Sequence, residues 1–203
     1  EENNKEIKQW KRIEVLKDFR FYIICMTILA MPWIATGAWV FQSFITSSKD
    51  WGPYVIAQSF MVYSILSVLT LFISGFLIDK FSSRKLLIYM NIPLFFATVI
   101  LFYFNAEISS FFFFGLIGIT NGLANVLGSS IWAEIYGVKY IGSIKALTTA
   151  LMVFATAFGT ALFGFLIDTG FSIEQIAIFS GTYIFGTIIL LYLVKNKLNP
   201  QYL

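Results

Sequence analysis

Residues 62–85 read VYSILSVLTLFISGFLIDKFSSRK, and this stretch decides the class of fold. Its first seventeen residues carry no Asp, Glu, Lys or Arg, and the charges then arrive together as Asp79, Lys80, Arg84 and Lys85. A long uncharged apolar run that ends in a basic loop is typical of a helix that crosses a lipid bilayer. The composition agrees, because 58% of the 203 residues are hydrophobic, only 12% are charged, and the mean hydropathy is +0.80.

The same pattern recurs along the whole chain. Charge-free runs occupy residues 21–48, 51–78, 86–106, 108–133, 146–167 and 175–194. Each run has the roughly 20 residues that a helix needs to cross a hydrocarbon core of about 30 Å. Backbone amides find no water in lipid, and the residue alternation of a β-barrel is missing, so the spans are expected to be helices. The sequence therefore predicts an all-α integral membrane protein with six transmembrane helices.

We expect the chain to consist of two parts, a leading linker and a six-helix unit. Residues 1–19 are polar and begin without Met, so we interpret them as the end of a longer cytoplasmic linker. The last part of this linker, with Trp10 and Phe19, is predicted to lie on the membrane surface as a short amphipathic helix. Residues 20–203 are predicted to form the six-helix unit, with spans at about 20–46, 54–78, 85–104, 108–132, 143–167 and 174–195.

The basic residues predict the orientation of the spans. Thirteen Lys and Arg residues fall in residues 1–20, the second loop, the fourth loop and the C-terminal tail, whereas the opposite face has only Lys49. Because cytoplasmic loops carry the excess of Lys and Arg, both termini are expected in the cytoplasm, in a multi-pass protein of the cell (inner or plasma) membrane. This topology also accounts for the net charge of +3, so a nucleic-acid partner is not expected.

Several chemistries are excluded by composition. The chain has no His and a single Cys, Cys25, inside the first span, where we interpret it as a packing residue. Disulfide frameworks, His-containing zinc sites, and Ser-His or Cys-His nucleophiles are therefore excluded. No charged residue lies deep in a span, so an enzyme with convergent acid, base or metal ligands is not expected, and neither is a cofactor.

An internal repeat divides the six spans into two triplets. The string Gly75-Phe-Leu-Ile-Asp79 ends the second span, and Gly164-Phe-Leu-Ile-Asp168 ends the fifth, 89 positions later. Three spans separate the two copies, so they lie on opposite faces of the membrane. This placement predicts two inverted three-helix repeats.

The loop after the second span carries a family signature. The pattern Gly75-x-x-x-Asp79-Lys80-x-Ser82-x-Arg84-Lys85 resembles the loop motif of the major facilitator superfamily (MFS) between the second and third helices of a six-helix half. Ser82 departs from the motif, which has Gly there. Two features resemble the C-terminal half of such a transporter. One is the polar leading segment. The other is the stretch Tyr136-Gly137 followed by Gly142 and then by a small-residue helix that ends in Gly-x-x-x-Asp-x-Gly, here Gly164 to Gly170.

The resemblance implies that the first helix of each triplet lines a central cavity and the third faces lipid. The substrate-pathway candidates are therefore Trp33 and Gln42 on the first span, and Asn121 and Asn125 on the fourth. The two asparagines are four residues apart and share one helix face near mid-membrane. The alternatives are interhelical hydrogen bonding for the asparagines, aromatic packing for Trp33 and a rim position for Gln42.

The loop motif itself, Gly75, Asp79, Lys80, Arg84 and Lys85, is the expected gate. Gly75 would let a neighbouring helix approach, and Asp79 can cap the N-terminus of a facing helix. An Asp79 contact that forms only when the cytoplasmic side is closed would bias alternating access. The alternative is that the basic residues only fix the topology. Glu134, at the end of the fourth span, is a candidate ionisable group if the solute is charged, and a solvated helix end otherwise.

The resemblance implies secondary transport of a small organic solute, such as an organic acid or another metabolite, by alternating access in the lipid bilayer. The N-terminal six-helix half of the same protein would be the partner. A non-transporting receptor or scaffold on the same fold remains the alternative, as does a six-helix protein that dimerises.

Overall fold

The computed structural model describes residues 7–202. The predicted fold class is confirmed: the described chain is helical, and six of its helical segments are long and apolar enough to cross a membrane. The elements are α1 (Arg12–Leu16), α2 (Phe19–Val40), α3 (Gln42–Lys49), α4 (Pro53–Phe81), α5 (Ser83–Leu87), α6 (Ile92–Tyr103), α7 (Glu107–Tyr136), α8 (Ile141–Asp168), α9 (Ile173–Val194) and the short 3₁₀ turn η1 (Lys195–Lys197).

Two of the six spans are interrupted. The first passes from α2 into α3 at Phe41, and the third passes from α5 into α6 through residues 88–91. The second break has a clear cause, since Pro93 lacks a backbone N–H and is tolerated only in the first turn of a new helix. Asn91 fills this break and donates from Nδ2 to the Thr27 carbonyl of α2 at 2.7 Å.

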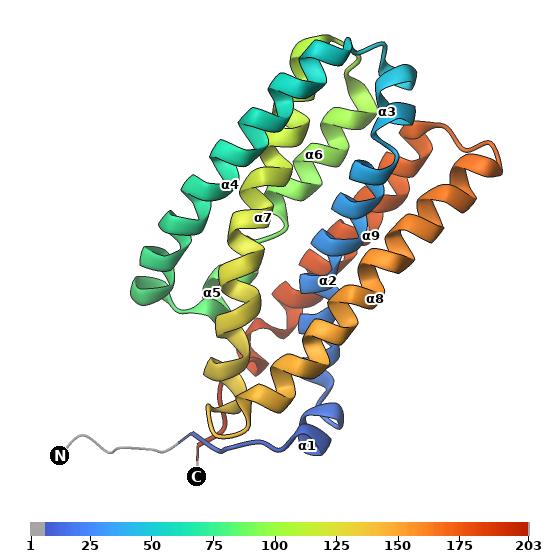
Figure 1. Cartoon of the computed structure of the whole chain (residues 1–203). Helices are drawn as coiled ribbons and strands as arrows, with labels where there is room; N and C mark the ends of the chain where they lie inside the picture. Colours follow the sequence, from blue (N-terminus) through green and yellow to red (C-terminus); the bar gives the residue numbers. More distant parts are fainter. Residues whose placement is uncertain (1–6, 203) are drawn as a thin grey trace.

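The two triplets pack by exchanging partners (Figure 1). The first helix of each triplet packs on the second helix of the other, so α2 lies along α8 and α7 lies along α4. The third helices also cross over, because α6 packs on α7 and α9 on α2, and α6 and α9 contact each other. Each contact has a counterpart in the other triplet. This is the arrangement that two inverted three-helix repeats predict.

The seam between α4 and α7 is made of small residues. Ser59, Ser67 and Ser74 of α4 are buried, and Ser59 Oγ lies 2.7 Å from Ser110 Oγ of α7. A Cβ added at Gly122 of α7 would lie 2.6 Å from the Ser67 carbonyl oxygen, so only glycine allows this approach. The α2–α8 seam uses the same device, since a Cβ at Gly159 would overlap the Trp33 carbonyl. Close backbone approach of this kind is how helices associate in lipid, where apolar burial between helices contributes little.

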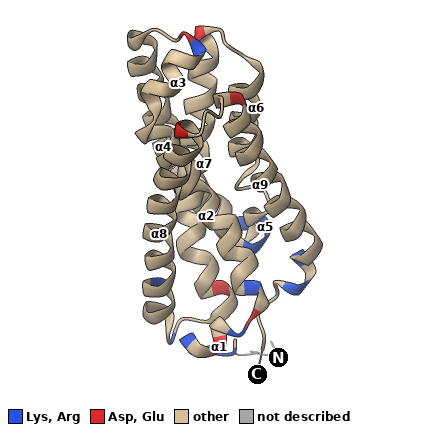
Figure 2. Ribbon diagram, turned by 90° about the vertical axis from the view of Figure 1, so that its right-hand side faces the viewer, with Lys and Arg blue, Asp and Glu red and all other residues tan. Residues whose placement is uncertain are grey.

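Charged residues lie toward the two ends of the bundle (Figure 2). Most Lys and Arg residues lie at the end where α2 begins and α9 finishes, which we call the basic end. At the opposite end, Lys49 is 1% exposed and donates from Nζ to Asn105 Oδ1 at 2.9 Å and to Glu174 Oε1 at 2.7 Å. Trp51 Nε1 donates to the Asn105 carbonyl at 3.0 Å. These contacts tie the end of α3, the α6–α7 loop and the start of α9, and so join the two triplets.

The turn between α4 and α5 is strained. Ser82 adopts φ 72° and ψ 149°, a conformation that suits glycine, at the one position where the loop motif has glycine and this chain does not. Its hydroxyl is buried and has no partner among the described residues. The backbone therefore makes the glycine turn in spite of the serine side chain.

Replacing Lys49 should loosen the joint between the triplets. Lys49→Met leaves Asn105 and Glu174 without their donor, and because both are partly solvent-exposed we expect a loss of about 1–3 kcal/mol in the free energy of unfolding. Thermal unfolding in detergent, followed by tryptophan fluorescence, measures the change. Lys145→Met, at an exposed position of the basic end, serves as the control. A Lys49→Met protein that melts with the wild type would refute the structural role of this contact.

Ser82→Gly should stabilise the protein. Glycine adopts a positive φ without the steric penalty that the serine Cβ incurs, so we expect a gain of about 1 kcal/mol. Ser82→Ala separates the two contributions, since it removes the unpartnered hydroxyl but keeps the Cβ. If Ser82→Ala stabilises as much as Ser82→Gly in the same melting assay, the effect comes from the hydroxyl and the backbone is not strained.

Candidate functional site

A pocket opens midway along the bundle between α2, α4, α7 and α8. Its volume is about 220 Å³, and Asn125 and Met152 at its edge are exposed. It is lined by uncharged side chains, namely Ile28, Met31, Pro32, Ala35, Thr36 and Trp39 of α2, Tyr63 of α4, Asn121, Ala124 and Asn125 of α7, and Met152 of α8. A mostly apolar hollow with a few polar groups is the usual form of a small-molecule site.

The side-chain amide nitrogens of the two asparagines donate hydrogen bonds that fix both side chains in place. Asn121 Nδ2 donates to Ser67 Oγ of α4 at 2.8 Å, and Asn125 Nδ2 donates to the Asn121 carbonyl at 2.8 Å. Asn121 is half-buried, whereas Asn125 is exposed. Among the described residues the two Oδ1 atoms accept no hydrogen bond, so both are available to a donor in the pocket. Asn121 thus also serves as an interhelical contact, whereas the side chain of Asn125 bonds only within its own helix.

An aromatic wall faces the asparagines. The Trp39 ring lies 4.9 Å from Tyr63 and 4.6 Å from Phe60, measured between centroids, and 5.6 Å from Phe114. Neither Trp39 nor Tyr63 was among the predicted pathway residues. The signal for Tyr63 was its spacing, because it lies four residues before Ser67 and so shares the face of α4 that meets α7.

The predicted pathway residues do not all come together. Asn121 and Asn125 line the central pocket, but Trp33 is 3% exposed and packs on the far side of α2 against Phe158, Phe163, Phe179 and Tyr183, with centroids 5.3–6.3 Å away. Helix geometry gives the reason: Pro32, Thr36 and Trp39 share one face of α2, and residue 33 points about 100° away from it.

Gln42 lies in a separate hollow at the Lys49 end. It begins α3 and lines a pocket of about 420 Å³ with Ser43, Thr46 and Ser47 of α3 and with residues of α4. The Gln42 Oε1 atom is buried and has no partner among residues 7–202. Gln42 is therefore placed apart from the two asparagines.

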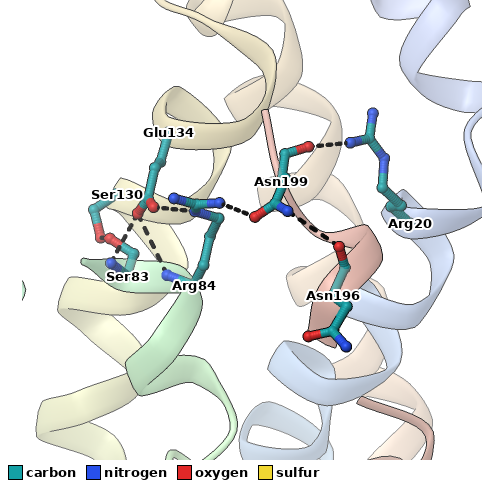
Figure 3. Close-up of polar contacts among 7 residues, drawn as sticks. All are labelled: Arg20, Ser83, Arg84, Ser130, Glu134, Asn196 and Asn199. Carbon is teal, nitrogen blue, oxygen red and sulfur yellow. Dashed lines mark hydrogen bonds and ion pairs between the residues drawn. The ribbon is translucent and has the colours of Figure 1, made fainter. Parts of the chain in front are cut away.

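One residue of the loop motif, Arg84, forms an ion pair with α7 (Figure 3). Arg84 Nε pairs with Glu134 Oε1 of α7, and Glu134 Oε2 accepts from the backbone nitrogens of Ser83 at 2.8 Å and Arg84 at 3.3 Å. Ser83 Oγ donates to Ser130 Oγ at 2.8 Å. Glu134 therefore caps the first turn of α5 and holds the α4–α5 turn against α7.

The other motif residues face outward. Asp79, Lys80 and Lys85 are exposed, and Lys80 Nζ lies 5.3 Å from the Phe81 ring centroid. A Cβ added at Gly75 would meet no described atom within 4 Å. Within the part of the chain that the structure describes, the close helix approach predicted for Gly75 is thus not made. Sequence reasoning named Arg84 and Glu134 separately but did not pair them, because nothing in their spacing brings residues 50 positions apart together.

Among residues 7–202 no three His, Cys, Asp or Glu side chains are grouped as metal ligands. The polar groups of the site are amides, hydroxyls and one ion pair, which suit reversible binding and not bond breaking.

The comparisons with known proteins give one finding. The family model of the Major Facilitator Superfamily matches residues 22–201, which is nearly the whole chain. Neither the curated proteins nor the solved structures gave a significant match. The matched range contains the central pocket, the loop motif and all of the six spans except the first three residues of α2. The chain therefore belongs to the major facilitator superfamily and is a multi-pass membrane transporter.

Proposed function

We propose that the chain moves a small organic solute by alternating access, and that the pocket of Asn121 and Asn125 forms its share of the binding site. The observation that carries the proposal is the pocket itself: free amide oxygens and an aromatic wall lie midway between the two ends of the bundle. Secondary transporters bind solutes near the membrane midplane at such a position. An organic acid or another small metabolite would donate a hydrogen bond to the amide oxygens and place its apolar part against the aromatic wall.

A partner is proposed to cover α4 and α8. Of the most hydrophobic 18 residues of each span, only 11% in α4 and 17% in α8 are buried inside the bundle, whereas the share in the other spans is 39–61%. Both helices contribute to the lining of the central pocket, and α4 also carries the exposed Asp79 and the half-buried Gly75, which has no neighbour within 4 Å of an added Cβ. We propose that an N-terminal six-helix half of the same protein covers these faces and completes the pocket. The basic end would face the cytoplasm at the cell membrane, as the excess of Lys and Arg favours.

The Arg84–Glu134 ion pair supports a gate at the basic end. It fixes the α4–α5 turn on α7, a helix that lines the pocket, and leaves Asp79 exposed for the partner. An Asp79 contact formed only when the basic end is closed would favour the closed state by its differential interaction with the two states. Arg84 then positions the turn, and Asp79 makes the contact.

A receptor or scaffold on the same fold is the second candidate. It would need the α4 and α8 faces for assembly but would not need Asn121 and Asn125 to face an open pocket. Substituting the asparagines therefore separates the two functions.

Asn125→Ala should lower solute uptake without lowering stability. Its side chain is exposed and bonds only within α7, so melting should be unchanged while uptake of radiolabelled monocarboxylates or dicarboxylates into proteoliposomes falls about ten-fold, equivalent to ~1.4 kcal/mol of binding. Asn121→Ala should lower both uptake and stability, because it also removes the bond to Ser67. Thr182→Ala on α9, a polar span residue outside the central pocket, is the control.

Two results would speak against the proposal. Wild-type uptake by the Asn125→Ala protein would exclude the pocket from the pathway. A wild type that transports none of these solutes, yet assembles normally with its partner, would favour the receptor or scaffold.

A further inference from the structure

The segment that follows α9 crosses beneath the basic end. After η1, Leu198 is 1% exposed, and the chain then pairs with the leading segment through Lys8 N and the Gln201 carbonyl at 2.8 Å and a bridge between Ile7 and Tyr202. The two chain segments that flank the six spans therefore lie together under the bundle. Asn199 sits in the middle of this crossing.

Asn199 joins two arginines from different elements (Figure 3). Its side-chain Oδ1 accepts from Arg84 Nη1 at 2.6 Å, and its backbone carbonyl accepts from Arg20 Nη1 at 2.7 Å. Its Nδ2 donates to the Asn196 carbonyl at 3.1 Å, which fixes the amide plane. A hydrogen bond to a charged donor is stronger than one between neutral groups, so both contacts are of the stronger kind.

Each arginine is already part of an ion pair. Arg20 Nη2 lies 2.7 Å from Asp18 Oδ2, both side chains are nearly fully buried, and Asp18 caps the start of α2. Arg84 pairs with Glu134 on α7. Asn199 thus links a fixed pair at the start of α2 with the pair that holds the α4–α5 turn, and it does so without adding a charge between two cations.

We propose that Asn199 is a positioning residue of the gate: it holds the Arg84 guanidinium against Glu134 and thereby keeps the strained α4–α5 turn on α7. The proposal rests on the proposed function, because it assigns Asn199 to the gate of that transporter. Without the Oδ1 acceptor, Nη1 of Arg84 loses its anchor, and the turn at Ser82 keeps only the contacts of Glu134 and the hydrogen bond between Ser83 and Ser130. The equilibrium between closed and open states of the basic end then shifts toward open.

The chain provides matched variants for a test. Asn199→Ala removes the acceptor for Arg84 but keeps the backbone carbonyl that binds Arg20. Asn199→Asp keeps an acceptor for Arg84 and adds a negative charge beside it, so the hold on Arg84 should not weaken, although the bond to the Asn196 carbonyl is lost. Asn196→Ala alters the same segment and residue type but retains the backbone carbonyl that Asn199 uses, so it is the control.

The first measurement is hydrogen exchange of residues 79–91 in the full chain. Asn199→Ala should raise exchange in this turn about five-fold, the factor that ~1 kcal/mol produces in an equilibrium. Asn196→Ala should leave exchange unchanged, and Asn199→Asp should not raise it. In the Glu134→Gln background Asn199→Ala should add little, because both act through Arg84. Unchanged exchange in Asn199→Ala, or full additivity with Glu134→Gln, would overturn the proposal.

The second measurement tests how often the basic end opens. In a Cys25→Ser background, which removes the only cysteine, Ser129→Cys on the exposed face of α7 is labelled from the basic end with a membrane-impermeant maleimide. Asn199→Ala should raise the labelling rate about five-fold, again the effect of ~1 kcal/mol. Raised exchange with unchanged labelling would reduce Asn199 to a structural role and overturn the proposal. Failure of transport itself is read separately from wild-type uptake, so the two proposals fail independently.

Discussion

The structure depends on one constraint: lipid offers no water to a backbone amide and little apolar gain between helices. The first half of the constraint makes every span a helix. The second half decides where helices meet, since close approach is then possible only where side chains are small. Gly122 and the buried serines of α4 make one such seam, and Gly159 against the Trp33 carbonyl makes the other. The exchanged pairing of the triplets follows from these two seams.

The two ends of the bundle use charge differently. At the Lys49 end a single buried cation joins the end of α3, the α6–α7 loop and the start of α9. At the basic end two ion pairs are linked by a neutral amide, and exposed basic side chains surround them. The contacts at the Lys49 end thus meet on one buried cation, whereas those at the basic end run through a series of residues from α2 to α7.

Much of the fold could be predicted from the sequence, because charge-free runs and the repeated Gly-Phe-Leu-Ile-Asp string are local signals. The break at residues 88–91 was not predicted, although Pro93 marks it, since the apolar run continues through it. The site was harder. Asn121 and Asn125 share a face by their spacing alone, but choosing Trp39 over Trp33 requires knowing which face of α2 meets α7 and which meets α8 and α9. Likewise, the contacts of Arg84 with Glu134 and Asn199 depend on tertiary packing across long stretches of chain.

Helix α4 has the reverse of the arrangement found in helices of water-soluble proteins, because its large apolar side chains face outward and its serines face the bundle. Two of those hydroxyls already bond to carbonyls of their own helix, Ser59 to Val55 at 2.8 Å and Ser74 to Leu71 at 3.0 Å. During synthesis α4 is complete before α7 exists, and it can rest in the bilayer without an orphaned polar group on these two residues. The seam is therefore ready before its partner arrives, and insertion and packing can proceed as separate steps of biogenesis.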